Sequence, residues 1–410
     1  MANRATNRTM RGLWLTAVLV GLLALMTMTA LAQDAPVAPA APASATLTLG
    51  ATTTPAGGQD FWLTAVSFQG SWGSGGKQQG QFRQPRDVAI DAAGNFYISD
   101  HRNSRIQKFS PAGNFMSIIG APGKGQGKLL RPNAIAISGN QLAVADTDNH
   151  RVVVYNTNGA FVRQWGTFGT AAGQFDRPNG VAYDAAGNLY VADTWNHRIQ
   201  VFTSQGVFVR QWGTLGSADG QLRFPTHIDF DAAGSLYVAD SNNLRIQFFS
   251  ADGVFQRKFG VTGTAPGQFR FPVGIDIGAD GFVYVTDTFN NRVQKYSANG
   301  GFVAQWNQVA GSGTISRPNG LLMVGNLLYV SDIDANRIQI YSQATATVDH
   351  GQQVPLTLPA GSYSVTQAPK SGWTFGSATC TGGNPTAISG GVRLSLADGA
   401  AVSCTFASNQ

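Results

Sequence analysis

A motif that recurs every 45–47 residues occupies the middle of this 410-residue chain. The segment YISDHRNSRIQKF has five further copies, among them LYVADTWNHRIQVF and VYVTDTFNNRVQKY, and a Pro opens each copy. The copies share an Asp followed five places later by an Arg, at Asp100/Arg105, Asp146/Arg151, Asp193/Arg198, Asp240/Arg245, Asp287/Arg292 and Asp332/Arg337. Self-similarity at such a period is typical of solenoids and propellers, in which each copy is one structural unit.

Each copy contains four short segments with the pattern of β-strands. An alternating stretch such as GVAYD follows the Pro, and the turn DAAGN leads to a second strand, LYVAD. A polar loop, a third strand such as RIQVF, a turn and a fourth strand such as VFVRQWG complete the copy. Asp, Asn and Gly turns between such runs are typical of antiparallel hairpins. The chain contains 50 Gly and no Glu, a strong helix former, so we predict an all-β fold rather than a helical bundle or a doubly wound α/β enzyme.

These residues closely resemble the NHL-repeat family, whose motif runs through P-x-G-(V/I)-A-x-D, (L/V)-Y-V-(A/S)-D and N-(H/N/S)-R-(I/V)-Q. The resemblance covers residues 66–343 and implies a six-bladed β-propeller. The sixth copy ends at Tyr341 without a fourth strand, whereas SFQGSWG at 67–73 parallels AFVRQWG at 160–166. We therefore expect residues 66–73 to pair with the last blade and close the ring, because closure removes exposed sheet edges.

The segments that flank the propeller resemble a second kind of module. Residues 354–406 are similar to the prealbumin-like or SpaA-like immunoglobulin-type modules of bacterial surface proteins. ATLTLGATTTPAGGQDFWLTA at 45–65 has the form in which such modules begin. The resemblance implies a small, discontinuous β-sandwich formed by 45–65 and 344–410, with the propeller inserted between them; the alternative is a disordered N-terminal arm.

Cys380 and Cys404 are the only cysteines, and both lie in predicted strands of this module. An oxidising compartment would favour an intramolecular disulfide between them. By the chain-entropy model such a bond contributes about 3 kcal/mol. The alternative is a redox-active or metal-binding pair.

The N-terminus has the pattern of a secretion signal. Residues 1–32 combine Arg4, Arg8 and Arg11 with an apolar stretch and an Ala-x-Ala site, so we predict a cleaved signal peptide, the alternative being a membrane anchor. The Ala/Pro-rich segment 33–44 is predicted to be an extended spacer. We therefore expect a secreted or cell-surface protein without a membrane span in its mature chain. Loss of the three Arg lowers the formal charge from +6 to +3, which does not favour nucleic acid as a partner.

The residues that carry the repeat are interpreted as structural. We expect the six Asp/Arg pairs to be exposed and to contribute about 0–1 kcal/mol each. The polar loops between the second and third strands vary more, from HRNS to TWNH and TFNN. Variable loops on a rigid scaffold are suited to binding, and the candidates on them are Trp195, Phe289, Asp148, His150 and His197. We identify no catalytic or cofactor-binding residue.

His227 differs from its counterparts in the other copies. It stands in PTHIDF where PNGVAYD and PVGIDIG have Gly, and we expect it to face the central channel with Asp229 and Asp276. Propeller lyases related to this family, including peptidylamidoglycolate lyase, hold zinc through three channel His. The innermost segments of this chain supply only one, so we expect no metal; zinc or calcium in the channel is the alternative.

These observations predict a secreted, non-catalytic NHL-repeat propeller that binds a protein or glycan outside the cytoplasm. The alternative is a metal-dependent propeller lyase or lactone hydrolase whose site lies in the channel.

Overall fold

A computed structural model describes residues 44–54, 61–309, 313–348, 353–359, 361–367, 374–388, 391–396 and 401–409. The predicted signal peptide and all but the last residue of the predicted spacer lie outside this part of the chain. The described residues confirm the predicted fold class, with six antiparallel blades and a sandwich module.

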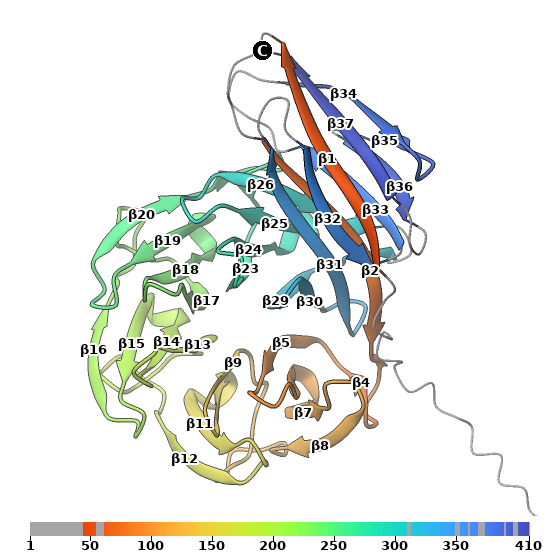
Figure 1. The fold of residues 1–410 in the computed structure, drawn as a ribbon. Helices are drawn as coiled ribbons and strands as arrows, with labels where there is room; N and C mark the ends of the chain where they lie inside the picture. The colour runs from red at the N-terminus through yellow and green to blue at the C-terminus, as the bar shows by residue number, and fades with distance from the viewer. Residues whose placement is uncertain are drawn as a thin grey trace, which may run out of the picture. The chain divides into compact units, whose positions relative to one another are not determined.

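Six blades surround a central channel (Figure 1). In blades 1–5, which are each formed by one continuous segment, the chain runs from the innermost to the outermost strand. The strands of the first three blades are β5 (Pro85–Ile90), β6 (Phe96–Asp100), β7 (Arg105–Phe109) and β8 (Phe115–Ile119); β9 (Ile135–Ser138), β10 (Gln141–Asp146), β11 (Arg151–Asn156) and β12 (Phe161–Trp165); and β13 (Gly180–Tyr183), β14 (Leu189–Asp193), β15 (Arg198–Phe202) and β16 (Phe208–Trp212). Blades 4 and 5 are β17 (Pro225–Phe230), β18 (Leu236–Asp240), β19 (Arg245–Phe249) and β20 (Phe255–Phe259); and β23 (Pro272–Ile277), β24 (Val283–Asp287), β25 (Arg292–Tyr296) and β26 (Phe302–Trp306). Each innermost strand contacts the innermost strand of the next blade.

Blade 6 is assembled from both ends of the repeat region. β29 (Pro318–Val324), β30 (Leu327–Asp332) and β31 (Arg337–Val348) come from the sixth copy, and β2 (Phe61–Trp72) supplies the outermost strand. In this pairing Phe68 lies opposite Tyr341 and Trp72 opposite Ile338. The innermost strand β29 contacts β5 of blade 1. The predicted closure of the ring is therefore confirmed.

Strands β2 and β31 continue past the last blade into the sandwich module. β2 also pairs with β33 (Gly361–Gln367), which is followed in the same sheet by β36 (Gly391–Leu396) and β35 (Thr386–Ile388). The second sheet has the order β32 (Gln353–Pro359), β1 (Ser44–Thr54), β37 (Ala401–Asn409) and β34 (Thr374–Thr381). Cys380 and Cys404 lie opposite each other on β34 and β37 and form the predicted disulfide.

Alternation along the strands places apolar side chains between neighbouring blades. Tyr190 of β14, for example, packs edge-on against Phe230 of β17 in the next blade, with ring centres 4.8 Å apart. Ile199, Val201 and Ile228 belong to the same buried cluster. Burial of this kind is the main stabilising contribution of such a fold, and it holds each innermost strand in a fixed orientation at the channel.

The Asp/Arg pairs of the first five blades are buried, which corrects the expectation that they are exposed; in the sixth, Asp332 is buried and Arg337 is 25% exposed. All six Asp side chains are 0% exposed, and the Arg Nε atoms lie 2.7–2.8 Å from an Asp oxygen in the first five blades and 3.8 Å in the sixth. Blade 3 shows why: Arg198 also donates to the carbonyl oxygens of Thr170, Ala171 and Gln174, so the preceding loop covers the pair. The figure of about 0–1 kcal/mol per pair applies to solvated pairs and therefore does not describe these buried ones.

Short 3₁₀ helices form the loop that links the second and third strands of blades 1–5. They are η1 (His101–Asn103), η2 (Thr147–Asn149), η3 (Thr194–Asn196), η4 (Ser241–Asn243) and η5 (Thr288–Asn290). We call the side of the ring that carries them the η-loop face. Within the described ranges, no helix is long and apolar enough to cross a membrane.

Candidate functional site

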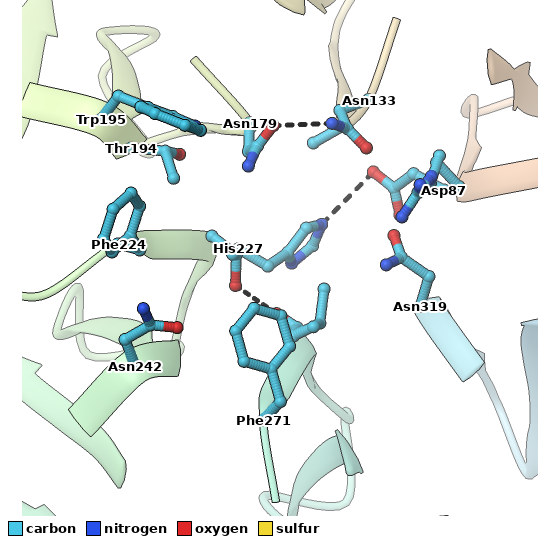
Figure 2. A pocket seen from close by; sticks show the side chains of 14 residues that line it. Asp87, Asn133, Asn179, Thr194, Trp195, Phe224, His227, Asn242, Phe271 and Asn319 are labelled. Atoms are coloured by element: carbon cyan, nitrogen blue, oxygen red, sulfur yellow. Dashed lines mark hydrogen bonds and ion pairs between the residues drawn. The ribbon is translucent and has the colours of Figure 1, made fainter. Parts of the chain in front are cut away.

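A pocket of about 290 Å³ opens where the innermost strands begin, on the η-loop face (Figure 2). Its lining comes largely from the residues that directly follow the Pro of each copy. The lining residues are Arg86, Asp87, Asn133, Ala134, Asn179, Thr194, Trp195, Phe224, Thr226, His227, Asn242, Phe271, Val273 and Asn319. We call this cavity the mouth pocket. Because every blade contributes, the pocket exists only when the ring is closed.

The residue before each Pro has a left-handed backbone, with φ between +48° and +72°. This conformation is unusual for bulky residues such as Phe224 and Phe271 and costs about 1–3 kcal/mol each. In most blades a side chain from the preceding blade stabilises it by accepting the backbone N–H. His197 Nδ1, for example, accepts from Phe224 N at 3.1 Å, and His150 Nδ1 from Arg177 N at 3.2 Å. These two predicted binding-loop residues thus connect neighbouring blades.

Aromatic side chains from blades 3 to 5 form one wall of the pocket. Trp195 is 48% exposed and meets Phe224 edge-on at 5.4 Å between ring centres. Phe271 stacks on the exposed Phe289 at 5.0 Å. Trp195 and Phe289, both predicted as binding-loop residues, therefore belong to the same wall. Trp195 lines the pocket itself, and Phe289 supports the lining residue Phe271. Exposed aromatic surface of this kind is suited to ligand contact.

An ion pair crosses the floor of the pocket between opposite blades. His227 Nε2 of blade 4 lies 3.3 Å from Asp87 Oδ2 of blade 1 (Figure 2). The opposite nitrogen of the same imidazole lies 3.0 Å from the Ile275 carbonyl oxygen, and the Ile135 backbone N–H donates to Asp87 Oδ2 at 2.9 Å. Burial by itself lowers the pKa of His227, but Asp87, Asp229 and Asp276 together raise it above its ordinary value. His227 remains 16% exposed, toward the pocket and the channel below it.

Glycines explain why so few side chains reach this level of the channel. In blades 3, 5 and 6 the position of His227 is taken by Gly180, Gly274 and Gly320. A Cβ on Gly180 would lie 2.3 Å from the Thr226 carbonyl oxygen, and one on Gly274 would lie 2.0 Å from that of Asn319. Neighbouring innermost strands therefore approach closely there, and only Asp87 and His227 place long side chains at this level.

Asp229 and Asp276 lie deeper, in a second cavity of about 210 Å³ that continues the channel below His227. Asp229 Oδ2 accepts from Ile277 N at 3.0 Å, and Asp276 Oδ2 accepts from Met323 N at 2.8 Å. Burial raises the pKa of Asp229 to about 6. Burial and the neighbouring Asp229 raise the pKa of Asp276 well above its ordinary value.

These carboxylates make the stability of the propeller depend on pH. Because the pKa of Asp229 is higher in the folded state than in the unfolded chain, its contribution is complete below about pH 4 and is lost as the pH rises through 6. The raised pKa values of Asp276 and His227 act in the same direction. We expect Asp229→Asn to raise the free energy of unfolding at pH 7 by on the order of 2 kcal/mol and to flatten its decline between pH 4 and 7.

Urea unfolding at several pH values measures this effect, with Asp252→Asn, at an 85% exposed carboxylate, as the matched control. Parallel curves for the wild type and Asp229→Asn would contradict the prediction.

The channel residues were also the candidate metal ligands. In the part of the chain that the structure describes, no three His, Cys, Asp or Glu side chains are arranged to hold a metal ion. His227, Asp229 and Asp276 share the channel, yet they form hydrogen bonds and ion pairs with Asp87 and with backbone groups.

Arg86, which the sequence did not single out, lines the mouth pocket beside Asn319. The Asn319 amide is satisfied when its nitrogen donates to the Arg86 carbonyl oxygen at 3.0 Å and its oxygen accepts from Arg86 Nη1 at 3.2 Å. Arg86 Nε is buried and has no hydrogen-bond acceptor among the described residues. Burial, together with Arg317 and Arg102, lowers the pKa of Arg86 to about 10, so its guanidinium stays charged at neutral pH.

Among the remaining candidates, Asp148 lies outside the mouth pocket. Its carboxylate pairs with Arg131 at 3.3 Å and with Arg177 at 3.8 Å. Arg177 in turn lies with its guanidinium carbon 5.0 Å from the centre of the Trp195 ring. Asp148 is therefore connected to the aromatic wall through Arg177.

Sequence reasoning missed Arg86, Asp87, Phe224 and Phe271. A usable signal was present, because an alignment of the six copies on their Pro places Asp87 at the position of His227. The same alignment places Phe224 and Phe271 directly before the Pro, where three other copies have Arg. Comparing the copies at every position, rather than only in the loops between the second and third strands, would have identified these lining positions.

Two family models match the chain. The model for the NHL repeat matches residues 82–109, 129–155, 175–202 and 269–296. The model for a prealbumin-like fold domain matches residues 329–410.

Curated relatives share only short stretches with the chain. Protein brain tumor of Drosophila melanogaster is 38% identical over 69 residues, which are 17% of this chain and 7% of that protein. Peptidyl-glycine alpha-amidating monooxygenase of Mus musculus is 38% identical over 81 residues, 18% of this chain and 8% of that protein. The chain thus spans less than a tenth of the length of either relative.

Solved structures share the fold at low sequence identity. A protein of unknown function from Bacteroides thetaiotaomicron has a TM-score of 0.54 at 18% identity, over 69% of this chain and 76% of that one. An auxiliary nutrient binding protein from the same organism has a TM-score of 0.51 at 12% identity, over 70% and 77%. A gluconolactonase from Xanthomonas campestris has a TM-score of 0.50 at 12% identity, over 65% and 88%. These likenesses show the architecture alone.

Proposed function

Because the chain carries NHL repeats in a six-bladed propeller joined to a prealbumin-like domain, we propose that it is a secreted binding protein without catalytic activity. It recognises a protein or glycan ligand outside the cytoplasm, through the η-loop face of the propeller. The predicted signal peptide and the disulfide between Cys380 and Cys404 support this location.

The mouth pocket is the observation that carries the proposal. It combines a partly exposed aromatic wall with several neutral amides, as binding sites for small ligands or ligand ends commonly do. Its volume of about 290 Å³ is close to the lower end of the range for such sites, ~300–1,000 Å³. The left-handed backbone at Phe224 and Phe271 adds support, since strained residues gather at functional sites.

Trp195→Ala tests the proposal, because it removes a half-exposed lining residue of the wall without disturbing the blade core. We expect at least a tenfold loss of affinity for ligands found by screening residues 33–410 against glycan and peptide arrays, since central aromatic contacts dominate binding. Phe168→Ala is the matched control, because Phe168 is exposed yet does not line the pocket. Equal binding by both variants, or no ligand on any array, would contradict the proposal.

The alternative is a metal-dependent lyase or lactone hydrolase with its site in the channel. His227 and its ion pair with Asp87, at the meeting point of both cavities, are the observations that favour it. The same binding assay separates the two functions when it is repeated after dialysis against a chelator. Binding that survives dialysis supports the metal-free proposal, whereas binding or turnover that needs zinc or calcium supports the enzyme.

A further inference from the structure

The two sides of the mouth pocket differ in chemistry. Trp195, Phe224 and Phe271 come from blades 3 to 5, and Arg86 comes from blade 1, on the opposite side of the ring. Figure 2 shows Phe224 and Trp195 across the pocket from Asp87, the neighbour of Arg86 in the chain. A ligand that fills the pocket therefore contacts an apolar wall at one end and a cation at the other.

Arg86 differs from the other arginines around the pocket. Arg317 pairs with Asp334 at 3.3 Å, Arg131 pairs with Asp148 at 3.3 Å, and Arg102 Nε donates to Gln84 Oε1 at 2.8 Å. Among the described residues, no carboxylate lies within ion-pair distance of Arg86, and its buried Nε has no acceptor. A partly buried guanidinium without an anion is costly, so an anionic group from a ligand would complete its surroundings.

Asp87 does not neutralise Arg86, although it is the next residue. Asp87 Oδ2 is engaged by His227 Nε2 at 3.3 Å and by the Ile135 N–H at 2.9 Å. Its charge is thus balanced by the imidazole from the opposite blade. Its second oxygen, Oδ1, is buried and has no hydrogen-bond partner among the described residues.

Neutral amides occupy the space between the cation and the aromatic wall. Asn133 Nδ2 donates to Asn179 Oδ1 at 2.6 Å, which leaves the Asn133 oxygen and the Asn179 nitrogen for a ligand (Figure 2). Asn242 and Thr226 extend this polar lining. Groups that both donate and accept hydrogen bonds suit the hydroxyls of a sugar ring, which do the same.

We propose that the mouth pocket binds the terminal uronic acid ring of an acidic glycan, with the ring carboxylate on Arg86 and the ring against Trp195 and Phe224. This inference rests on the proposed function and names its ligand class. A carboxylate accepts two parallel hydrogen bonds from a guanidinium, which is the geometry that Arg provides and Lys does not. A pocket of about 290 Å³ has room for one such ring.

Isothermal titration with digalacturonic acid and with its methyl ester tests the proposal, because esterification removes the negative charge of the carboxyl groups and leaves the sugar rings and their hydroxyls unchanged. We expect the acid to bind the wild type about 10- to 100-fold more tightly than the ester, as hydrogen bonds to charged groups contribute more than neutral ones. Arg86→Gln should abolish that preference, and Arg86→Lys should restore part of it. Arg270→Gln, which removes an exposed charge next to Phe271, should leave it unchanged.

Asn319→Asp is an independent test that does not remove the buried arginine. It places a carboxylate where the Asn319 amide now meets Arg86, so we expect a more stable protein that has lost the preference for the acid. Equal binding of acid and ester, or binding of neither, would overturn the uronic acid proposal. If neutral glycans or peptide C-termini bind and Trp195→Ala weakens that binding, only the proposed ligand class is wrong. If no ligand shows binding that depends on Trp195, the proposed function fails as well.

Discussion

The Asp193→Ala variant is expected to unfold with a free energy about 3–5 kcal/mol below that of the wild type. Asp193 is 0% exposed and accepts four hydrogen bonds, from the Asp176 N–H at 2.8 Å, Asn196 at 2.9 Å, Arg198 Nε at 2.7 Å and Gln200 at 2.9 Å. Its removal leaves a buried guanidinium without its anion and several donors without an acceptor. Both consequences are costly, because neither group can turn to water.

Guanidinium-induced unfolding of the oxidised protein measures the effect. Asp252→Ala is the matched control, because Asp252 pairs with Arg210 at 3.6 Å but is 85% exposed, and such pairs contribute about 0–1 kcal/mol. We expect the double variant Asp193→Ala/Arg198→Met to recover part of the loss, since it removes the unpaired charge. If Asp193→Ala costs no more than Asp252→Ala, the repeated pairs do not stabilise the blades.

Trp72→Ala is expected to destabilise the propeller by about 3–5 kcal/mol and to open its ring. Trp72 is 2% exposed at the end of β2. Its ring lies 5.3 Å from Tyr329 of blade 6, and 4.9 Å from Phe96 and 6.3 Å from Phe109 of blade 1. Loss of this ring leaves a cavity at the junction that joins the first blade to the last.

Thermal unfolding and limited proteolysis check this prediction together. We expect a lower melting temperature and new cleavage in the chain before β5 for Trp72→Ala, and neither for Trp195→Ala, whose side chain is half exposed. Unchanged melting and proteolysis of Trp72→Ala would show that β2 does not hold the ring closed.

Local patterns made the architecture predictable. The alternation in LYVAD and RIQVF, with Gly and Asn turns between them, depends on neighbours within one copy, and six copies indicate six blades. The parallel between 67–73 and 160–166 predicted that β2 completes blade 6. The exposure of Asp193 and Arg198 was misjudged because a loop that begins some 28 residues before Arg198 covers the pair, through Thr170 and Ala171.

The candidate site was predictable only in part, as Asp87 and His227 show. His227 stood out because it replaces a Gly, and its place at the channel followed from its strand. The ion-pair partner of His227 could not be predicted from the sequence, because Asp87 lies 140 residues earlier and only closure of the ring brings blades 1 and 4 together. Arg86 was equally hidden, since a missing anion becomes visible only when every neighbouring carboxylate has been assigned its partner.

The order of residues was enough to predict the blade, the number of blades, the strand that closes the ring and a disulfide between Cys380 and Cys404. Each of these depends on side-chain alternation, turn chemistry or composition, which the order of residues expresses directly. The burial of the Asp/Arg pairs in blades 1–5, and the pocket that Arg86, Asp87, His227 and Trp195 line together, became visible only in the three-dimensional arrangement of the blades. Such a pocket combines single residues from separate blades, and their distances are set by how the ring closes rather than by any local pattern.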